Sequence, residues 1–170
     1  MKAVVVYESH WGNTADIARA IADGIGSGTR ALNTDEATRQ ALAGVDLIVA
    51  GSPVIAFALP RDGSLNQIAK DEKAPVPPDT SHPLMRTWLH DLPVGHGFAA
   101  AFETRIWWSL RGATGTIESK LRESGYERLL PGERFIVSGG YGPLRDGELE
   151  RARRWGAALA AAMAEQLVPA

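Results

Sequence analysis

A short polar loop near the N-terminus carries the side chains best suited to bind a ligand. Residues 9–14, SHWGNT, lie between an apolar run and a segment with isoleucines four residues apart, which predicts a strand, a loop and a helix. The N-terminus of a helix presents unpaired N–H groups and the positive end of its dipole. The glycine lets the backbone approach a ligand closely, and the side chains of Ser9, Asn13 and Thr14 add hydrogen-bond donors. The loop therefore predicts an anion site, and a phosphate fits it.

The residues that this loop lacks narrow the kind of phosphate. It has no G-K-[ST] pattern, whose lysine reaches the β- and γ-phosphates of a nucleoside triphosphate, and no G-x-G-x-x-G pattern follows the first strand. Gly24, Gly26 and Gly28 follow a helical pattern instead of a strand, so we interpret them as the stop of that helix. A monophosphate held by uncharged donors is the remaining prediction.

Composition restricts the class of protein. The chain has 170 residues, 45% of them hydrophobic and 22% charged, so we expect one domain over residues 1–170 with a sizeable core. The lack of cysteine excludes disulfides and thiolate chemistry, and the four histidines lack metal-ligand spacing, so we expect no metal site. A net charge of -2 favours neither nucleic acid nor an anionic membrane as a partner. The first apolar run is too short for a signal peptide or a membrane span, which predicts a soluble, cytoplasmic protein without membrane insertion.

Strand-like and helix-like patterns alternate along the chain, which predicts an α/β fold with a parallel sheet covered on both faces. The predicted strands are 2–8, 29–34, 45–53, 97–104 and 133–140. The first predicted helix begins near Asn13 or Thr14, one of which would be its N-cap. Four further helices are predicted at 35–44, 83–91, 115–124 and 146–166. Residues 60–83, rich in proline and charge, interrupt this alternation. A connection of this length is usually a functional lid or a mobile loop, and a disordered insertion has the same composition.

Several segments together resemble the flavodoxin-like FMN-binding family. Residues 7–21, YESHWGNTADIARAI, are similar to its phosphate loop, and AGSP at 50–53 is similar to its second loop. FETR at 102–105 and GPLRDGELERA at 142–152 are similar to segments of actinobacterial flavodoxin-family proteins. The resemblance implies a flavodoxin-like doubly wound α/β fold, with five parallel strands in the order 2-1-3-4-5, helices on both faces and a non-covalent FMN.

The resemblance also implies which residues surround the FMN, since ligands of such sheets sit outside the carboxyl ends of the strands where the strand order reverses. Those around the phosphate would be Ser9, His10, Trp11, Gly12, Asn13 and Thr14. Those along the isoalloxazine ring would be Ser52, Pro53, Val54, Ile55, Ala56 and Phe57. Those near its pyrimidine end would be Glu103, Thr104 and Arg105.

Three side chains near this site have more than one interpretation. Trp107 and Trp108 could stack on the flavin, or form a pair in the core or on a surface that faces a partner. His10 could donate a proton to a reduced flavin or a substrate, or it could lie beside the phosphate or face solvent. These alternatives stay open at the level of sequence.

The arginines and one late loop are given simpler interpretations. We interpret Arg61 and Arg111 as surface salt-bridge partners, and Arg105 as a site residue because of its place in FETR. Residues 139–148, GGYGPLRDGE, are explained as a turn and a helix cap. Their place at the edge of the sheet predicts no direct contact with the flavin.

The resemblance implies electron transfer between a reductase and a terminal acceptor as the function. The partner would be a redox protein or a small-molecule electron acceptor, and the sequence leaves the oligomeric state open. One alternative is an FMN-dependent NAD(P)H or quinone oxidoreductase that turns over by itself. Another is a flavodoxin-like scaffold with weak or lost FMN binding, because fold alone does not fix function.

Overall fold

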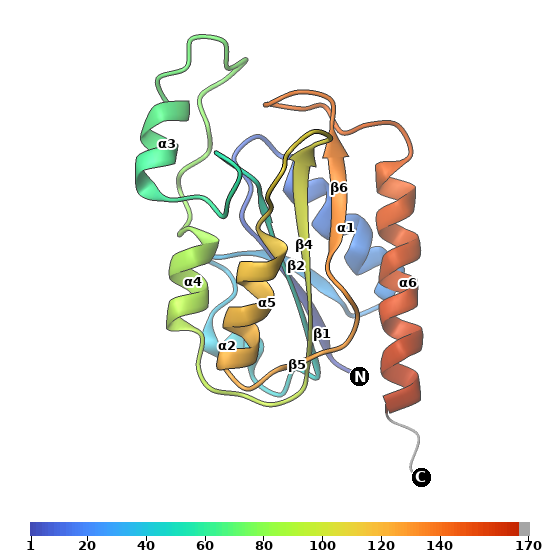
Figure 1. The fold of residues 1–170 in the computed structure, drawn as a ribbon. Helices are drawn as coiled ribbons and strands as arrows, with labels where there is room; N and C mark the ends of the chain where they lie inside the picture. The colour runs from blue at the N-terminus through green and yellow to red at the C-terminus, as the bar shows by residue number, and fades with distance from the viewer. Residues whose placement is uncertain (167–170) are drawn as a thin grey trace.

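A parallel β-sheet forms the centre of the computed structural model, which describes residues 1–166 (Figure 1). Its strands are β1 (Ala3–Tyr7), β2 (Arg30–Asn33), β3 (Leu47–Pro53), β4 (Phe98–Ile106), β5 (Glu127–Arg128) and β6 (Glu133–Val137). The order β2-β1-β3-β4-β5 confirms the predicted order 2-1-3-4-5, and β6 also pairs with β4. Each of these pairs is parallel, as the alternation of strands and helices predicts.

Two short strands share the fifth position of the sheet. β5 pairs with Phe98 and Ala99 at the start of β4, whereas β6 pairs with Phe102–Ile106 at its end. The predicted strand 133–140 is too long, because β6 ends at Val137. The residues after it form a loop at the carboxyl end of the sheet, next to the predicted site.

Helices cover both faces of the sheet. They are α1 (Asn13–Ile25), α2 (Arg39–Leu42), α3 (Asp62–Ile68), α4 (Met85–Asp91), α5 (Thr114–Glu123) and α6 (Glu148–Gln166). Side chains along a strand point alternately to the two faces. In β1, Val4 and Val6 therefore join a core with α4 and α5, whereas Ala3 and Val5 join a core with α1 and α6. Figure 1 shows these two helix pairs on opposite sides of the strands.

Two predicted segments differ from the structure. The predicted helix 35–44 is reduced to the short α2, and the long connection 60–83 contains α3, a helix that its sequence pattern does not predict.

No helix within residues 1–166 is long and apolar enough to cross a membrane. The same residues hold no cluster of histidine and carboxylate side chains that could bind a metal ion.

The interpretation of Gly24 as a helix stop is wrong. α1 continues through Gly24 and ends at Ile25, and Gly26 is its C-cap, with a φ of 120° that glycine adopts easily. A Cβ atom at Gly24 would overlap the backbone carbonyl of Arg153 on α6, and one at Gly156 would overlap the carbonyl of Ile21 on α1. These glycines therefore allow α1 and α6 to pack closely against each other.

Candidate functional site

Three loops meet at the carboxyl ends of the central strands. They follow β1, β3 and β4, which are parallel neighbours and therefore end at the same edge of the sheet, where Figure 1 shows the arrowhead of β4. β1 lies between β2 and β3, so the strand order reverses at this point. In open α/β sheets this position is the usual place for a ligand.

The first loop leaves the start of α1 open. Gly12, with a φ of 93°, occupies the N-cap position predicted for Asn13 or Thr14, and no side chain caps the helix. The first backbone hydrogen bond joins the N–H of Asp16 to the carbonyl of Gly12, at 2.9 Å. The N–H groups that open α1 are therefore available to an anion. The side-chain amide of Asn13 donates instead to the carbonyl of Tyr141, at 3.1 Å.

A cavity of about 220 Å³ opens between the three loops. Its lining contains most of the residues that the resemblance implies for the FMN: Ser9, His10, Trp11, Asn13, Thr14, Pro53, Val54, Ile55, Ala56, Thr104 and Arg105. The hydroxyl groups of Thr14 and Thr104, both buried, lie 2.7 Å apart and join the first loop to the third. The lining thus combines hydroxyl groups and the start of α1 with apolar side chains of the second loop.

The other predicted site residues lie outside this lining. Gly12 forms the turn of the first loop, and the hydroxyl of Ser52 is buried and donates to the carbonyl of Pro53, at 2.9 Å. Phe57 lines a different cavity on the far side of the second loop. Glu103 is fully buried and accepts hydrogen bonds from the N–H groups at the start of α5, so its carboxylate is occupied by the protein itself.

Residues outside the predicted set also line the cavity. They are Ile68, Ile106, Val137, Gly140 and Tyr141. Gly140 and Tyr141 belong to the segment 139–148, which we predicted to make no direct contact with the flavin, and they lie next to the predicted site. The ring of Tyr141 packs edge-on against Trp11, with 4.8 Å between centroids, and its hydroxyl donates to Asp71. An aromatic residue among glycines, as in GGYG, was the only signal in the sequence for this contact.

A buried carboxylate and imidazole hold the first loop from behind. The Oε1 atom of Glu8 lies 2.7 Å from Nε2 of His10, and its Oε2 atom accepts the N–H of Met85, at 2.6 Å. The Nδ1 atom of His10 lies 2.6 Å from the carbonyl oxygen of Asp79 and therefore donates, because a carbonyl only accepts. His10 thus faces neither solvent nor a substrate with its polar atoms.

Further contacts tie the connection 60–83 to the first loop. The N–H of Asp79 donates to the carbonyl of His10, at 2.8 Å, and Nε2 of His82 donates to the carbonyl of Ser9, also at 2.8 Å. The indole N–H of Trp11 donates to the carbonyl of Val76, at 3.1 Å. The second half of the connection is therefore held against the first loop, although residues 76–82 do not line the cavity themselves.

Protonation of His10 is expected to make stability depend on pH. Burial alone would lower the pKa of His10, but its hydrogen bonds to Glu8 and the Asp79 carbonyl, with the charges of both carboxylates, raise the pKa above 6.5. The stabilisation is therefore complete below pH 6.5, the value for the unfolded chain, and is lost as pH rises through the higher folded value. We expect the free energy of unfolding, measured with urea, to fall over this range.

A His10→Gln variant checks the assignment. It should lose this part of the pH dependence, whereas His90→Gln, at an exposed histidine of α4, should keep it. Parallel pH profiles for the wild type and His10→Gln would show that His10 does not cause the dependence.

The tip of the second loop is strained. Ile55 and Ala58 exchange two backbone hydrogen bonds of 3.0 and 3.1 Å around Ala56 and Phe57, whose φ angles are 50° and 62°. Residues other than glycine pay roughly 1–2 kcal/mol each for this conformation. The turn holds Phe57 near Trp108, with 5.9 Å between ring centroids. Trp107 and Trp108 are 68% and 52% exposed, which excludes the interpretation as a core pair.

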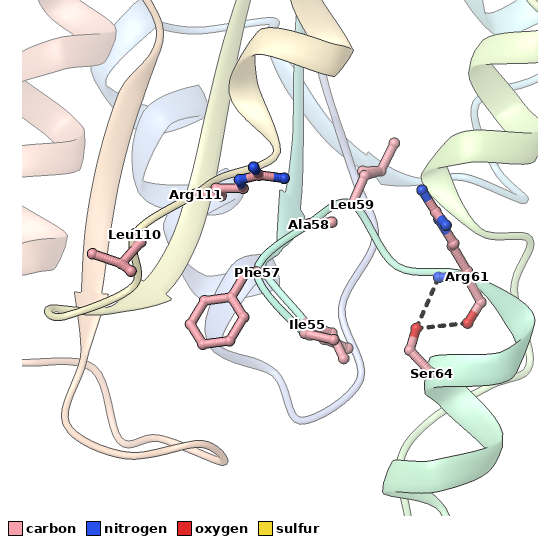
Figure 2. Close-up of a pocket in the computed structure, with 9 residues that line it drawn as sticks. Ile55, Phe57, Ala58, Leu59, Arg61, Ser64, Leu110 and Arg111 are labelled. Atoms are coloured by element: carbon pink, nitrogen blue, oxygen red, sulfur yellow. Dashed lines mark hydrogen bonds between the residues drawn. The ribbon is translucent and has the colours of Figure 1, made fainter.

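The three arginines of the site region have different surroundings. Arg105 is buried, lines the cavity and forms an ion pair with Glu103 at 3.0 Å. Arg61 and Arg111 form no ion pair with any carboxylate in residues 1–166, so their interpretation as salt-bridge partners is wrong. Figure 2 shows both of them at the cavity that Phe57 lines.

Comparison with known proteins connects this geometry to one fold. No protein-family model and no curated protein sequence matches the chain. Among solved structures, a flavodoxin from the domain Archaea is 25% identical, with a TM-score of 0.65 over 95% of this chain and 97% of that one. A flavodoxin variant from Pseudomonas aeruginosa is 19% identical, with a TM-score of 0.65 over 96% and 99% of the two chains.

A third similar structure is that of a flavodoxin, WrbA-like protein from Agrobacterium tumefaciens. It is 19% identical, with a TM-score of 0.60 over 97% of this chain and 98% of that one. At these identities the likeness concerns the fold, which agrees with the observed strand order. The chain therefore has the flavodoxin-like fold, with an open cavity at the reversal of its strand order.

Proposed function

We propose that this chain binds FMN non-covalently and transfers electrons as a flavodoxin-like redox protein of the cytoplasm. The observation that carries the proposal is the uncapped start of α1, which opens with the Ser9 and Thr14 hydroxyls onto the cavity between the three loops. The likeness in fold to two flavodoxins supports a flavin as the cofactor. A bound FMN would supply the redox chemistry, in steps of one or two electrons.

The residues of the chain would bind and orient this group. The N–H groups of Asn13 and Thr14, with the two hydroxyls, would hold the phosphate. The imidazole of His10 would hold the loop from behind without contacting the phosphate, because its ring nitrogens are bound to Glu8 and Asp79. The apolar residues of the second loop would exclude water from one side of the ring, and Tyr141 with Trp11 would close the phosphate end.

Titration of FMN fluorescence with the apoprotein tests the proposal. We expect FMN to bind at least about tenfold more tightly than riboflavin, because a phosphate adds several charge-assisted hydrogen bonds. Equal affinities would show that the loop holds no phosphate. Absence of binding would favour the alternative of a scaffold that does not use FMN.

A Thr14→Val substitution tests the phosphate site itself. Because it removes one hydroxyl without changing the shape of the side chain, we expect FMN affinity to fall about tenfold and riboflavin affinity to stay unchanged. Thr116→Val, at an exposed position of α5, is the matched control and should change neither. An equal loss for both flavins in Thr14→Val would contradict a phosphate contact at this residue.

The connection 60–83 favours a second candidate function, because its Ile68 lines the cavity and its second half is held against the first loop. A long connection beside a flavin site suits an FMN-dependent NAD(P)H or quinone oxidoreductase, in which water must be kept from the reacting atoms. Oxidation of NADPH with a quinone as acceptor, using this protein alone, separates the two functions. Sustained turnover would support the enzyme, and activity only with an added reductase or redox partner would support the carrier.

A further inference from the structure

A second cavity lies beside the strained turn at residues 55–58, on the side of α3 (Figure 2). Its volume is about 500 Å³, which lies within the range of roughly 300–1,000 Å³ that is usual for small-molecule sites. Ile55 and Ala56 line both cavities, whereas Phe57 and Leu110 line only this one. The phosphate loop contributes no residue to its lining. The turn thus separates this cavity from the one proposed for FMN.

The surroundings of this cavity carry positive charge without a paired carboxylate. Arg61 and Arg111 line it and form no ion pair within the described chain. Arg86 of α4 donates to the carbonyl of Leu59, a lining residue, at 3.2 Å, and its buried Nε atom has no partner. Ser64, the remaining polar residue of the lining, exchanges hydrogen bonds with the backbone of Arg61. Guanidinium groups placed in this way attract an anionic group, although the whole chain has a net charge of -2.

The walls of this cavity suit an aromatic ring. Phe57 is 43% exposed and is held there by a turn in which two residues other than glycine have positive φ. Backbone strain of this kind is concentrated at ligand sites, where the surrounding structure maintains it. Figure 2 shows the phenyl ring of Phe57 and the side chain of Leu110 on one side of the cavity and Arg61 on the other. A ligand here could place an apolar ring at one wall and a charge at the other.

We propose that this cavity binds an organic anion with a planar aromatic ring. The ring packs against Phe57 and Leu110, and the carboxylate, sulfonate or phosphate group of the ligand pairs with a guanidinium of the lining, that of Arg111 beside the ring or that of Arg61 across the cavity. The two guanidiniums lack a protein partner, so either pairs with the ligand without first breaking an ion pair. The site is distinct from the proposed FMN site and does not depend on it.

Calorimetric titration with anilinonaphthalene sulfonate, an aromatic anion, tests the proposal. The double variant Arg61→Gln/Arg111→Gln should bind the dye about tenfold more weakly than the wild type, because it loses the charged hydrogen bonds. Neutral phenylnaphthylamine should bind both proteins equally, since it never used the arginines. Arg122→Gln, at an exposed arginine of α5 outside this cavity, is the matched control and should bind the dye like the wild type.

The same titrations are repeated with saturating FMN. We expect unchanged affinity for the dye, because the two ligands occupy opposite sides of the turn. Displacement of the dye by FMN would place it in the flavin cavity and overturn the proposal. Lack of dye binding, or equal affinity in the double variant and the wild type, would also overturn it. Because the dye is also titrated into the protein without FMN, failure of the dye to bind can be told apart from failure of FMN to bind.

Discussion

Replacement of Glu103 by alanine is expected to lower the free energy of unfolding by about 3–5 kcal/mol, the usual cost of removing one partner of a buried ion pair. The carboxylate of Glu103 is fully buried. Its Oε2 atom accepts the N–H groups of Ala113 and Thr114, at 2.6 and 2.9 Å, and its Oε1 atom pairs with Arg105 at 3.0 Å. The variant would leave two N–H groups at the start of α5 and one buried guanidinium without an acceptor.

Urea-induced unfolding of Glu103→Ala measures this loss. Glu123→Ala is the control, because Glu123 forms an exposed pair with Lys120 on α5, and such pairs contribute less than about 1 kcal/mol. A similar, small loss in both variants would contradict the structural role of Glu103. Loss of FMN affinity with unchanged stability would instead support the role at the flavin that the resemblance implies.

Replacement of Gly24 by alanine is expected to destabilise the protein, although the same change stabilises an isolated helix by about 1 kcal/mol. The new Cβ atom would overlap the backbone carbonyl of Arg153, which cannot move independently of α6. Separation of the two helices would loosen the core that they share with the sheet. Overpacking of this kind costs about 1–3 kcal/mol.

Gly115→Ala is the matched control for this prediction. Gly115 lies in α5, and a Cβ atom there would meet nothing within 4 Å. Thermal or urea unfolding should show this variant as stable as the wild type or more stable by about 0.5–1 kcal/mol. If both substitutions changed the free energy of unfolding in the same direction, close packing of α1 on α6 would not be the reason for glycine at position 24.

The region of the proposed site combines segments that the sheet positions with a connection that hydrogen bonds hold in place. The start of α1 and the ends of β3 and β4 are positioned by strand pairing in the sheet. The parts of the proposed FMN site that they form therefore need few additional side-chain contacts to keep their shape. Residues 76–82 depend on hydrogen bonds to the first loop instead, among them those of His10 and His82. Deprotonation of His10 removes its donor to Glu8 but leaves a hydrogen on Nδ1 for the Asp79 carbonyl, so this contact persists at high pH.

Local sequence was enough to predict the features that depend on neighbouring residues. The β-branched runs predicted buried strands, the isoleucines four residues apart predicted α1, and the polar loop between them was placed at the start of that helix. The resemblance in four separate segments then implied the strand order that the structure confirms. Residues of the first loop could be predicted to lie together at this cavity because they follow one another in the chain.

The roles that local sequence could not predict depend on contacts between distant segments. Asn13 meets Tyr141, 128 residues away, and His10 meets Asp79, 69 residues away. Gly24 has the same local pattern as a helix stop, and only the approach of α6 gives it another role. Glu103 was placed at the flavin by its motif, but the position of α5 makes its carboxylate a cap for two N–H groups. The periodicity of a chain shows which face of an element is buried, whereas the partner on that face is chosen by the packing of the whole fold.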